Sequence, residues 1–428
     1  MTATMTAPPV EAVAPHLVTR VKDGDLSGAQ RALMALGVLL LAATTYTGLT
    51  GDDAGKKHFF FAYLVAYMFT LGICLGGLFF TMLQHIVRAG WSVGVRRIAE
   101  NVTGVLPWMF VLFLPIVLGF DTLFHHWVHA DPADKVIAGK SGYLNPTFFF
   151  VRVGIYFAIW IGLGTWFRRA SLAQDQSGDP TLSLKMSRMA APGLLLFALS
   201  ITFAAFDWIM SLDPHWFSTI FGITYFAGAF MAFLAFTILL AKWLGAKGYL
   251  REAITVEHYH DLGKLMFGFM VFWTYTNFSQ YMLIWYANLA EETAFYAHRQ
   301  HGGWDAVGTI LIVGHFFVPF AFLMSRHIKR NGFTLSLGAL FLLLMHWVDM
   351  QYLILPNMGH GEAHAAGGEH SFAHSVSEYL HGITWIDAAT LLGVVSLVAG
   401  FVIGQVRKHN LVPVRDPRLA ESLHFHNI

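Results

Sequence analysis

Seven ionisable side chains in or at the ends of long apolar segments of the 428-residue chain are candidates for chemistry: Asp121, Arg152, Asp207, His315, His346, Asp349 and Asp387. His85 lies at an inner end of one of these segments. A lone Asp or Arg at the centre of a membrane helix costs about 2.5–3.5 kcal/mol, so such groups should face a bundle interior or water. Together they offer acid–base chemistry, with carboxylates as proton stations, imidazoles as relays and a guanidinium that favours ionisation of a neighbouring carboxylate. For each carboxylate taken alone, a hydrated or capping role at a helix end is an equal alternative.

Arg152 gives the most specific prediction of this set. It lies about one and a half turns into an apolar segment at 146–167, too deep for a loop residue. A buried guanidinium needs a carboxylate partner, and Asp121 or Asp207 is expected to supply it. An ion pair that only fixes helix packing explains this residue as well as a functional role does.

His315 and His346 are expected at similar depth on consecutive antiparallel helices, about eleven and nine residues from the same membrane surface. That depth match suits two ligands of one haem, but four phenylalanines crowd the region. Asp349 follows His346 by three residues and shares its helix face. A proton relay, or a hydrogen bond between His346 and Asp349, is therefore favoured over haem. The crowding residues are Phe316, Phe317, Phe320 and Phe322.

The segment at 263–290 is unusually polar in its middle. Hydroxyl and amide groups on successive positions point in several directions, so some should contact partner helices or line a wet cavity. The candidates for a cavity lining are Tyr275, Asn277, Gln280 and Tyr281.

The positioning elements are apolar segments long enough to cross a membrane. The chain is 56% hydrophobic and 12% charged, about half the charged share of a soluble domain. An all-α polytopic membrane protein is therefore predicted, with spans of roughly 30 Å each. The ten expected spans are 31–50, 58–86, 98–120, 146–167, 188–211, 216–241, 263–290, 304–324, 333–355 and 383–405.

Basic residues predict the orientation of this membrane domain, which extends over 31–405. Of the 27 Lys and Arg residues, 21 lie in the two tails and the even-numbered loops or at the span ends next to them. The positive-inside rule then makes the tails at 1–30 and 406–428 cytoplasmic, and the first tail lacks the apolar core of a signal peptide. Net charge is only +1, without basic runs, so no nucleic-acid partner is expected.

Two further features bear on metals. Cys74 is the single cysteine and lies in an apolar segment, which excludes an intrachain disulfide or a Cys cluster for iron–sulfur or zinc. A His-rich stretch at 356–382, on the outer side, contains His360, His364, His370, His374 and His381. Imidazoles bind metals, but Gly and Ala spacing preorganises nothing, so a soluble loop without metal is the favoured interpretation.

A hairpin at 200–230 organises the middle of the chain. Asp213 and Pro214 are expected to cap and start the sixth span, because an aspartate accepts free helix N–H groups and proline suits a first turn. A weak repeat relates this hairpin to the third and fourth spans. It pairs Asp207 with Asp121 and Pro214 with Pro146.

Two segments of the chain resemble a known family. FDWIMSLDPHWFSTIFG at 206–222 and FSQYMLIWYANLAEET at 278–293 resemble the F subunits of bacterial alternative complex III, a respiratory quinol:electron-acceptor oxidoreductase. Those subunits are similar to the NrfD/polysulfide-reductase membrane-anchor family. The resemblance covers essentially the whole membrane region and omits the N-terminal tail and the His-rich loop.

The resemblance implies two four-helix bundles, spans two to five and six to nine, with peripheral first and last helices. It also implies a multi-pass subunit of the bacterial cytoplasmic membrane without its own redox centre, which supports quinol oxidation and is a candidate proton route. The sister integral subunit is the one implied to hold the quinol site, and the polar residues of 263–290 are candidates for a quinol contact or a cavity lining. The implied partners are a sister integral subunit, a periplasmic iron–sulfur subunit, multihaem cytochromes c, lipids and a terminal oxidase. A structural scaffold, a secondary transporter and a b-type cytochrome remain the alternatives.

Overall fold

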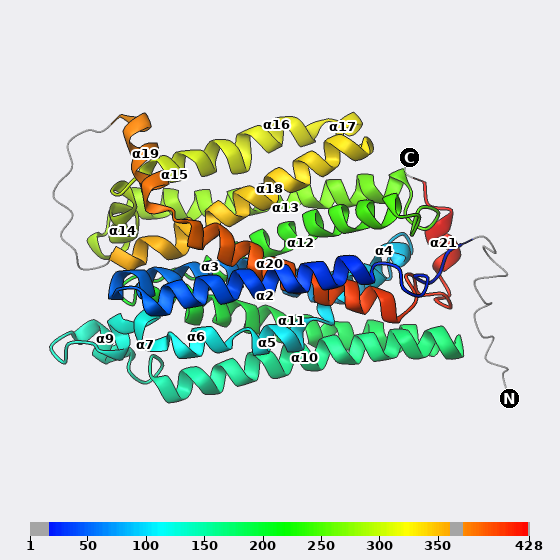
Figure 1. Ribbon diagram of the computed structural model, residues 1–428, viewed down its shortest axis with the longest axis horizontal. Coiled ribbons are helices and arrows are strands. Elements are labelled where there is room, and N and C mark those ends of the chain that lie inside the picture. Colours follow the sequence, from blue (N-terminus) through cyan, green and yellow to red (C-terminus); the bar gives the residue numbers. More distant parts are fainter. Residues whose placement is uncertain (1–16, 360–370, 427–428) are drawn as a thin grey trace.

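Long helices run side by side along one axis of the molecule (Figure 1). The computed structural model describes residues 17–359 and 371–426, which contain helices and turns but no strands. The unbroken long helices are α2 (Ser27–Thr50), α3 (Asp53–Ile86), α10 (Pro146–Ser177), α11 (Thr181–Trp208), α12 (Phe221–Ala246), α13 (Val256–Ala287), α18 (Gly332–Ile354) and α20 (Trp385–Lys408).

Two further crossings are segmented. The third consists of α4 (Val93–Thr103), α5 (Leu106–Val111), α6 (Leu114–Leu118) and α7 (Phe120–Leu123). Pro107 and Pro115 interrupt it, because proline lacks the N–H that continues a helix. The eighth consists of α15 (Trp304–Ile310), the π-helix η3 (Leu311–Phe317) and α16 (Val318–Met324).

Short helices connect these crossings. On the side opposite the two tails they are α8 (His125–Val128), α9 (Lys135–Lys140), η1 (Met210–Leu212), α14 (Ala290–Ala297), η2 (His298–Gln300), η4 (Leu355–Gly359) and α19 (Phe372–Gly382). At the tail end they are α17 (Arg326–Arg330) and α21 (Leu419–Leu423).

The predicted all-α multi-pass architecture is confirmed at this level. Among the described residues, nine helices are long and apolar enough to cross a membrane. The expected span at 263–290 forms α13, which at 32 residues is long enough but is not among these nine. The polar residues in its middle lower its hydropathy.

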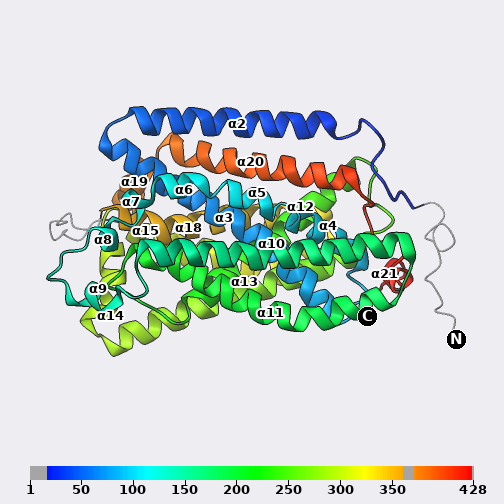
Figure 2. The same cartoon turned by 90° about the horizontal axis from the view of Figure 1, so that it is seen from below.

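The centre of the array is α3, which contacts α4, α11, α12, α18 and α20 and is buried throughout its apolar stretch. Gly76 allows a close approach to α12, because an added Cβ would overlap Phe233. The Tyr225 hydroxyl of α12 donates to the Met68 carbonyl of α3 at 2.8 Å. On one side, α2 packs along α20 and is the outermost long helix (Figure 2). The core therefore lies between α3 and α12.

The 200–230 hairpin differs from its predicted form. Asp213 and Pro214 do not start the next helix, since α12 begins only at Phe221 and has no side-chain cap. The Pro214 carbonyl accepts a hydrogen bond from Lys140 Nζ at 2.7 Å. Trp216 is buried and stacks on Phe295 at 4.0 Å between ring centroids. These two contacts hold the segment before α12 as an irregular loop.

The described part of the His-rich stretch contains a helix where a loop was expected. Its second half forms α19, where Ser371 accepts the His374 N–H. His381 lies in the last turn of this helix. His360, His364 and His370 lie outside the described residues.

Candidate functional site

A buried ion pair joins α10 to α11. Arg152 Nε lies 2.7 Å from Asp207 Oδ2, and Arg152 Nη2 lies 3.0 Å from Oδ1. The Tyr156 hydroxyl donates to the same Oδ2 at 2.7 Å. Asp207 is fully buried and Arg152 is 5% exposed. Three charge-assisted hydrogen bonds therefore compensate the burial of the carboxylate.

Helix geometry explains how this cluster forms. Asn145 caps α10 by accepting the Phe148 N–H at 2.9 Å, next to a proline in the first turn. Arg152 and Tyr156 are four residues apart and share one helix face. Arg152 also donates to the Tyr143 carbonyl at 2.9 Å, and its guanidinium lies 3.8 Å from the Tyr143 ring centroid. The arginine is held on every side.

Asp121 does not belong to this cluster. It is exposed on α7, and no hydrogen bond or ion pair of it occurs within 17–359 and 371–426. Of the two partners expected for Arg152, the structure selects Asp207. The repeat that paired Asp121 with Asp207 therefore does not extend to their environments.

A second buried cluster brings together Trp273, His315, His346 and Asp349. The two imidazole centroids are 6.4 Å apart, and the Trp273 ring lies 3.8 Å from His315. Trp273 Nε1 donates to Asp349 Oδ2 at 3.0 Å, and His346 Nδ1 lies 3.6 Å from the same oxygen. Both expectations, equal depth of the histidines and a shared face for His346 and Asp349, are met.

Local backbone features position these histidines. His315 lies in the π-helix that precedes Pro319, and a π-turn is a common irregularity at functional sites. His346 packs against Gly228 of α12, where an added Cβ would lie 2.7 Å from the imidazole Cε1. Phe69 of α3 lies 5.5 Å from His346, so five crossings converge on the cluster.

The imidazole nitrogens of this cluster are buried but poorly bonded. Neither nitrogen of His315 or of His346 has a hydrogen-bond partner among the described residues. Buried polar atoms normally have partners, and unpaired ones indicate water, a ligand or a chemical role. The ring separation is compatible with two axial ligands of one haem. A porphyrin would, however, have to displace Trp273 from its contact with His315 and its hydrogen bond to Asp349.

Asp387 has a structural role as a helix-capping residue at the start of α20. It accepts the Thr384 N–H at 2.9 Å and lies 2.8 Å from His58 Nε2 of α3. This is a capping box that also ties α20 to α3. Burial raises the pKa of the Tyr379 phenol, and the Asp387 carboxylate raises it further. Tyr379 remains a proton donor and donates to Gln351 at 2.6 Å.

The four polar candidates of α13 are not gathered into one cavity lining. Tyr275 and Tyr281 are exposed, whereas Gln280 is buried. Gln280 accepts from the Ser218 hydroxyl at 2.8 Å, and Asn277 donates to the Trp273 carbonyl at 3.1 Å. The polar residues therefore serve different faces of the helix.

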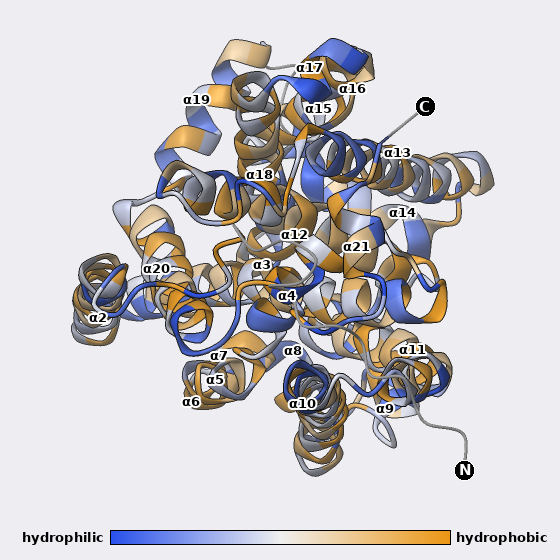
Figure 3. Ribbon diagram, turned by 90° about the vertical axis from the view of Figure 1, so that its right-hand side faces the viewer, coloured by the Kyte–Doolittle hydropathy of each residue, from blue (hydrophilic) through white to orange (hydrophobic). Residues whose placement is uncertain are grey.

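Sequence reasoning missed a buried charge network on α4, which lies with α21 at the end of the molecule that faces the viewer in Figure 3. Arg96 and Arg97, expected in a loop, are fully buried in α4. Both pair with Glu100, at 3.6 and 3.3 Å, and Arg97 also pairs with Asp175 at 2.7 Å. The three- and four-residue spacing to Glu100 was the available signal. Arg96 further binds Asp416 of the C-terminal segment.

Burial alone would raise the pKa of the Asp416 carboxyl, but the Arg96 guanidinium and the Arg418 N–H bring it below its ordinary value. The carboxylate form is thus stabilised where the C-terminal segment docks. A backbone hydrogen bond from Leu411 to Thr19, at 2.7 Å, joins the same segment to the start of the described chain.

The fold and these clusters define a class: a multi-pass helical membrane protein with acid–base groups buried between its helices. Comparison of the chain with protein-family models and with curated proteins gives no match. In the described ranges, no three His, Cys, Asp or Glu side chains come together in a group that could hold a metal ion.

Proposed function

We propose that the chain is a ten-span membrane subunit of a bacterial quinol-oxidising electron-transfer complex, and that it provides buried acid–base groups for proton movement. The two motifs at 206–222 and 278–293 support the assignment to this kind of complex. The excess of Lys and Arg in the tails and even-numbered loops supports a cytoplasmic location of both tails.

Ten crossings are proposed because the two described ends of the chain lie together. Leu411 binds Thr19, so the first and last helices begin and end on one side. An even number of crossings is required for that arrangement, and α13 supplies the tenth. We assign spans two to five and six to nine to two four-helix bundles, with α2 and α20 outside them.

The observation that carries the proposed chemistry is the pair of buried, unbonded imidazoles, His315 and His346, beside Asp349. An imidazole accepts a proton on one nitrogen and donates one from the other, so two neighbouring rings form a relay. Asp349 stabilises a transient imidazolium. Arg152 and Asp207, by contrast, are saturated by their mutual contacts, and we assign them an anchoring role.

The proposed subunit depends on partners for electron transfer. Haem and iron–sulfur clusters are assigned to cytochrome c and iron–sulfur subunits, and a sister membrane subunit is the proposed neighbour. A terminal oxidase is the proposed enzyme that accepts the electrons from this complex. The exposed Tyr275 and Tyr281 of α13 offer ring surfaces to quinol or to that neighbour.

The test uses the intact complex carrying His315→Gln or His346→Gln. Quinol oxidation and proton release are measured together, with His381→Gln in the exposed part of α19 as the matched control. At least a tenfold loss is expected for the two buried variants, because removing one acid–base group typically costs a factor of about 10²–10⁴ where proton transfer limits the rate. Unchanged turnover and proton stoichiometry would remove both histidines from the route.

A scaffold without proton or quinol roles is the second candidate function, favoured by the saturated Arg152–Asp207 pair. In that case the histidine variants lose assembly or thermal stability, while the assembled fraction keeps normal activity. A b-type cytochrome is tested separately by the absorption spectrum of the purified subunit, which would contain a Soret band.

A further inference from the structure

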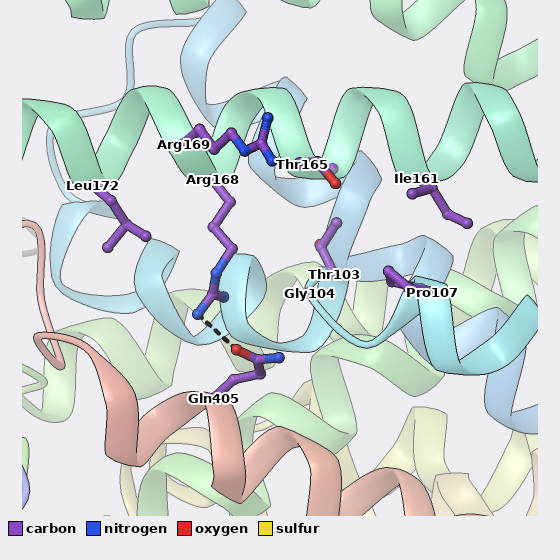
Figure 4. A pocket seen from close by; sticks show the side chains of 10 residues that line it. Thr103, Gly104, Pro107, Ile161, Thr165, Arg168, Arg169, Leu172 and Gln405 are labelled. Atoms are coloured by element: carbon purple, nitrogen blue, oxygen red, sulfur yellow. Dashed lines mark hydrogen bonds between the residues drawn. The ribbon is translucent and has the colours of Figure 1, made fainter.

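Two neighbouring cavities flank α10 near its tail-side end. One has a volume of about 230 Å³ and lies between α10, the α4–α5 junction and α20 (Figure 4). The other, of about 710 Å³, lies between α10 and α11. Ile161, Thr165 and Arg169 line both, so the two cavities meet across one face of α10.

The charged residues that line these cavities are all cations. Arg168 and Arg169 line the first, and Arg169 and Lys185 line the second, with no carboxylate in either lining. Arg169 and Lys185 are exposed. Lys185 stabilises the nearby carboxylate of Asp179, which also accepts from the Thr181 hydroxyl at 2.7 Å. This one carboxylate faces three cations, so the rim carries a net positive charge.

Arg168 is held in place by neutral acceptors. It donates to the Glu100 carbonyl at 2.9 Å and to Asn101 Oδ1 at 3.0 Å. It also donates to Gln405 Oε1 at 3.1 Å (Figure 4). Gly104 leaves room for this side chain, because an added Cβ would lie 2.9 Å from Arg168 Nη1. The Glu100 carboxylate is directed at Arg96 and Arg97 instead. Arg168 thus contributes a fixed charge to the floor of the cavity.

Most of the remaining wall residues are apolar, apart from Thr103, Thr165 and Gln405. Pro107 and Ile161 line the first cavity, and Trp166 and Leu182 line the second. Trp166 lies about 20 residues from the start of α10, which corresponds to roughly 30 Å of helix, the thickness of a bilayer core. The cations follow directly after it, where phosphate groups begin. A tryptophan at this depth is typical of the membrane interface.

We propose that these cavities bind an anionic phospholipid of the leaflet that faces the tails. Its phosphate lies among Arg168, Arg169 and Lys185, one acyl chain follows Ile161 and Pro107, and another follows Trp166 and Leu182. Basic pockets between membrane helices on the cytoplasmic side recognise anionic lipid headgroups through the same combination. The site is independent of the histidine cluster and of the electron-transfer function proposed above.

Native mass spectrometry of the detergent-solubilised complex tests the site. Phosphatidylglycerol or phosphatidylcholine is added to the complex that carries the natural chain or Arg169→Gln/Lys185→Gln. A matched control, Lys247→Gln/Arg326→Gln, removes one lysine and one arginine that are exposed at the same end but line neither cavity. Roughly ten- to thirtyfold weaker retention of phosphatidylglycerol is expected for the cavity variant only, at about a fivefold loss per charge.

A second readout localises the lipid. Phosphatidylglycerol with brominated acyl chains should quench tryptophan fluorescence, and Trp166→Phe should remove part of that quenching. Excess inorganic phosphate should not displace the lipid, because it lacks acyl chains. Equal retention by the cavity and control variants, or a quinone retained in place of lipid, overturns the proposal. Equal melting temperatures of the variants exclude unfolding as the cause.

Discussion

Arg152 and Asp207 form a two-point ion pair, with 2.7 and 3.0 Å separations, that ties α10 to α11 inside the membrane region. Tyr156 completes the coordination of the carboxylate. A buried pair of this kind contributes little net energy when intact, but removing one partner leaves an uncompensated charge. The relationship therefore predicts a large asymmetry between single and double substitutions.

Arg152→Gln and Asp207→Leu are each expected to lower the free energy of unfolding by about 3–5 kcal/mol, because each leaves one buried charge unpaired. The double variant Arg152→Met/Asp207→Leu removes both charges and should lose much less than the sum. Thermal and denaturant unfolding of the purified protein in detergent measure the three values. Additive losses would contradict the pairing.

Exposed Asp121 provides the control for this pair. Asp121→Asn changes the same chemical group on α7, where no ion pair is lost. Its free energy of unfolding should stay within about 0.5 kcal/mol of the natural chain, as for most surface substitutions.

Gly76→Ala is expected to destabilise the centre of the array. The new Cβ would overlap Phe233, and Ala229 O would lie only 3.1 Å away, so α3 and α12 must separate. Overpacking of this kind costs about 1–3 kcal/mol. Gly268→Ala on α13 meets nothing within 4 Å and should be neutral or slightly stabilising. Melting temperatures of the two variants measure the difference.

The sequence predicted the helices well because hydropathy depends on local composition. Predicted segments overlap the eight unbroken long helices and the two segmented ones, and the predicted start at residue 146 coincides with the start of α10. The partner of Arg152 was also predictable to within two residues, because a buried guanidinium needs a carboxylate and Asp121 and Asp207 were the two candidates. These predictions needed no knowledge of how helices pack.

The remaining features depend on tertiary contacts. Asp213 and Pro214 form a good helix start locally, yet the stacking of Trp216 on Phe295, 79 residues later in the chain, holds them in a loop. Burial of Arg96 likewise requires Asp416 from the C-terminal segment. Neither distant partner can be identified from one sequence.

Acid should loosen the docking of the C-terminal segment through His258. His258 lies in the first turn of α13, before its apolar stretch. Its Nδ1 accepts the Thr255 N–H at 3.1 Å, so Nε2 carries the proton and faces Ser422 Oγ at 3.1 Å. Burial lowers the pKa of His258 from 6.5 to about 4. The pKa of His258 is therefore lower in the folded protein than in the unfolded protein. The neutral imidazole contributes its full stability to the fold above pH 6.5, and this contribution is lost as the pH falls towards 4.

The expected loss approaches about 3 kcal/mol at pH 4, from roughly 1.4 kcal/mol per pKa unit. Melting temperatures between pH 7.5 and pH 4.5 measure it. His258→Gln should have a flatter profile, and its difference from the natural chain should shrink as the pH falls. Parallel profiles would show that other groups, such as the nearby Glu257 and Asp261, cause the acid sensitivity.

Gly228→Ala should change the geometry of the histidine cluster while all of its side chains are kept. The added Cβ would lie 2.7 Å from His346 Cε1 and 3.3 Å from Trp273 Cδ1, so the imidazole must move without being replaced. Its 3.6 Å approach to Asp349 and its spacing to His315 should change together. If the two histidines form a relay, proton release should fall several-fold and its pH profile should shift.

Gly154→Ala on α10 is the matched substitution, because nothing lies within 4 Å of its Cβ. Both variants are assayed in the assembled complex, with quinol oxidation, proton release and melting temperature measured on the same preparation. A stability loss of about 1–3 kcal/mol with normal proton release in Gly228→Ala would assign the cluster to packing. Reduced proton release in the assembled Gly228→Ala complex, with normal release in Gly154→Ala, would instead support the relay. The reason is that Gly228→Ala moves His346 but removes no titratable group from the chain.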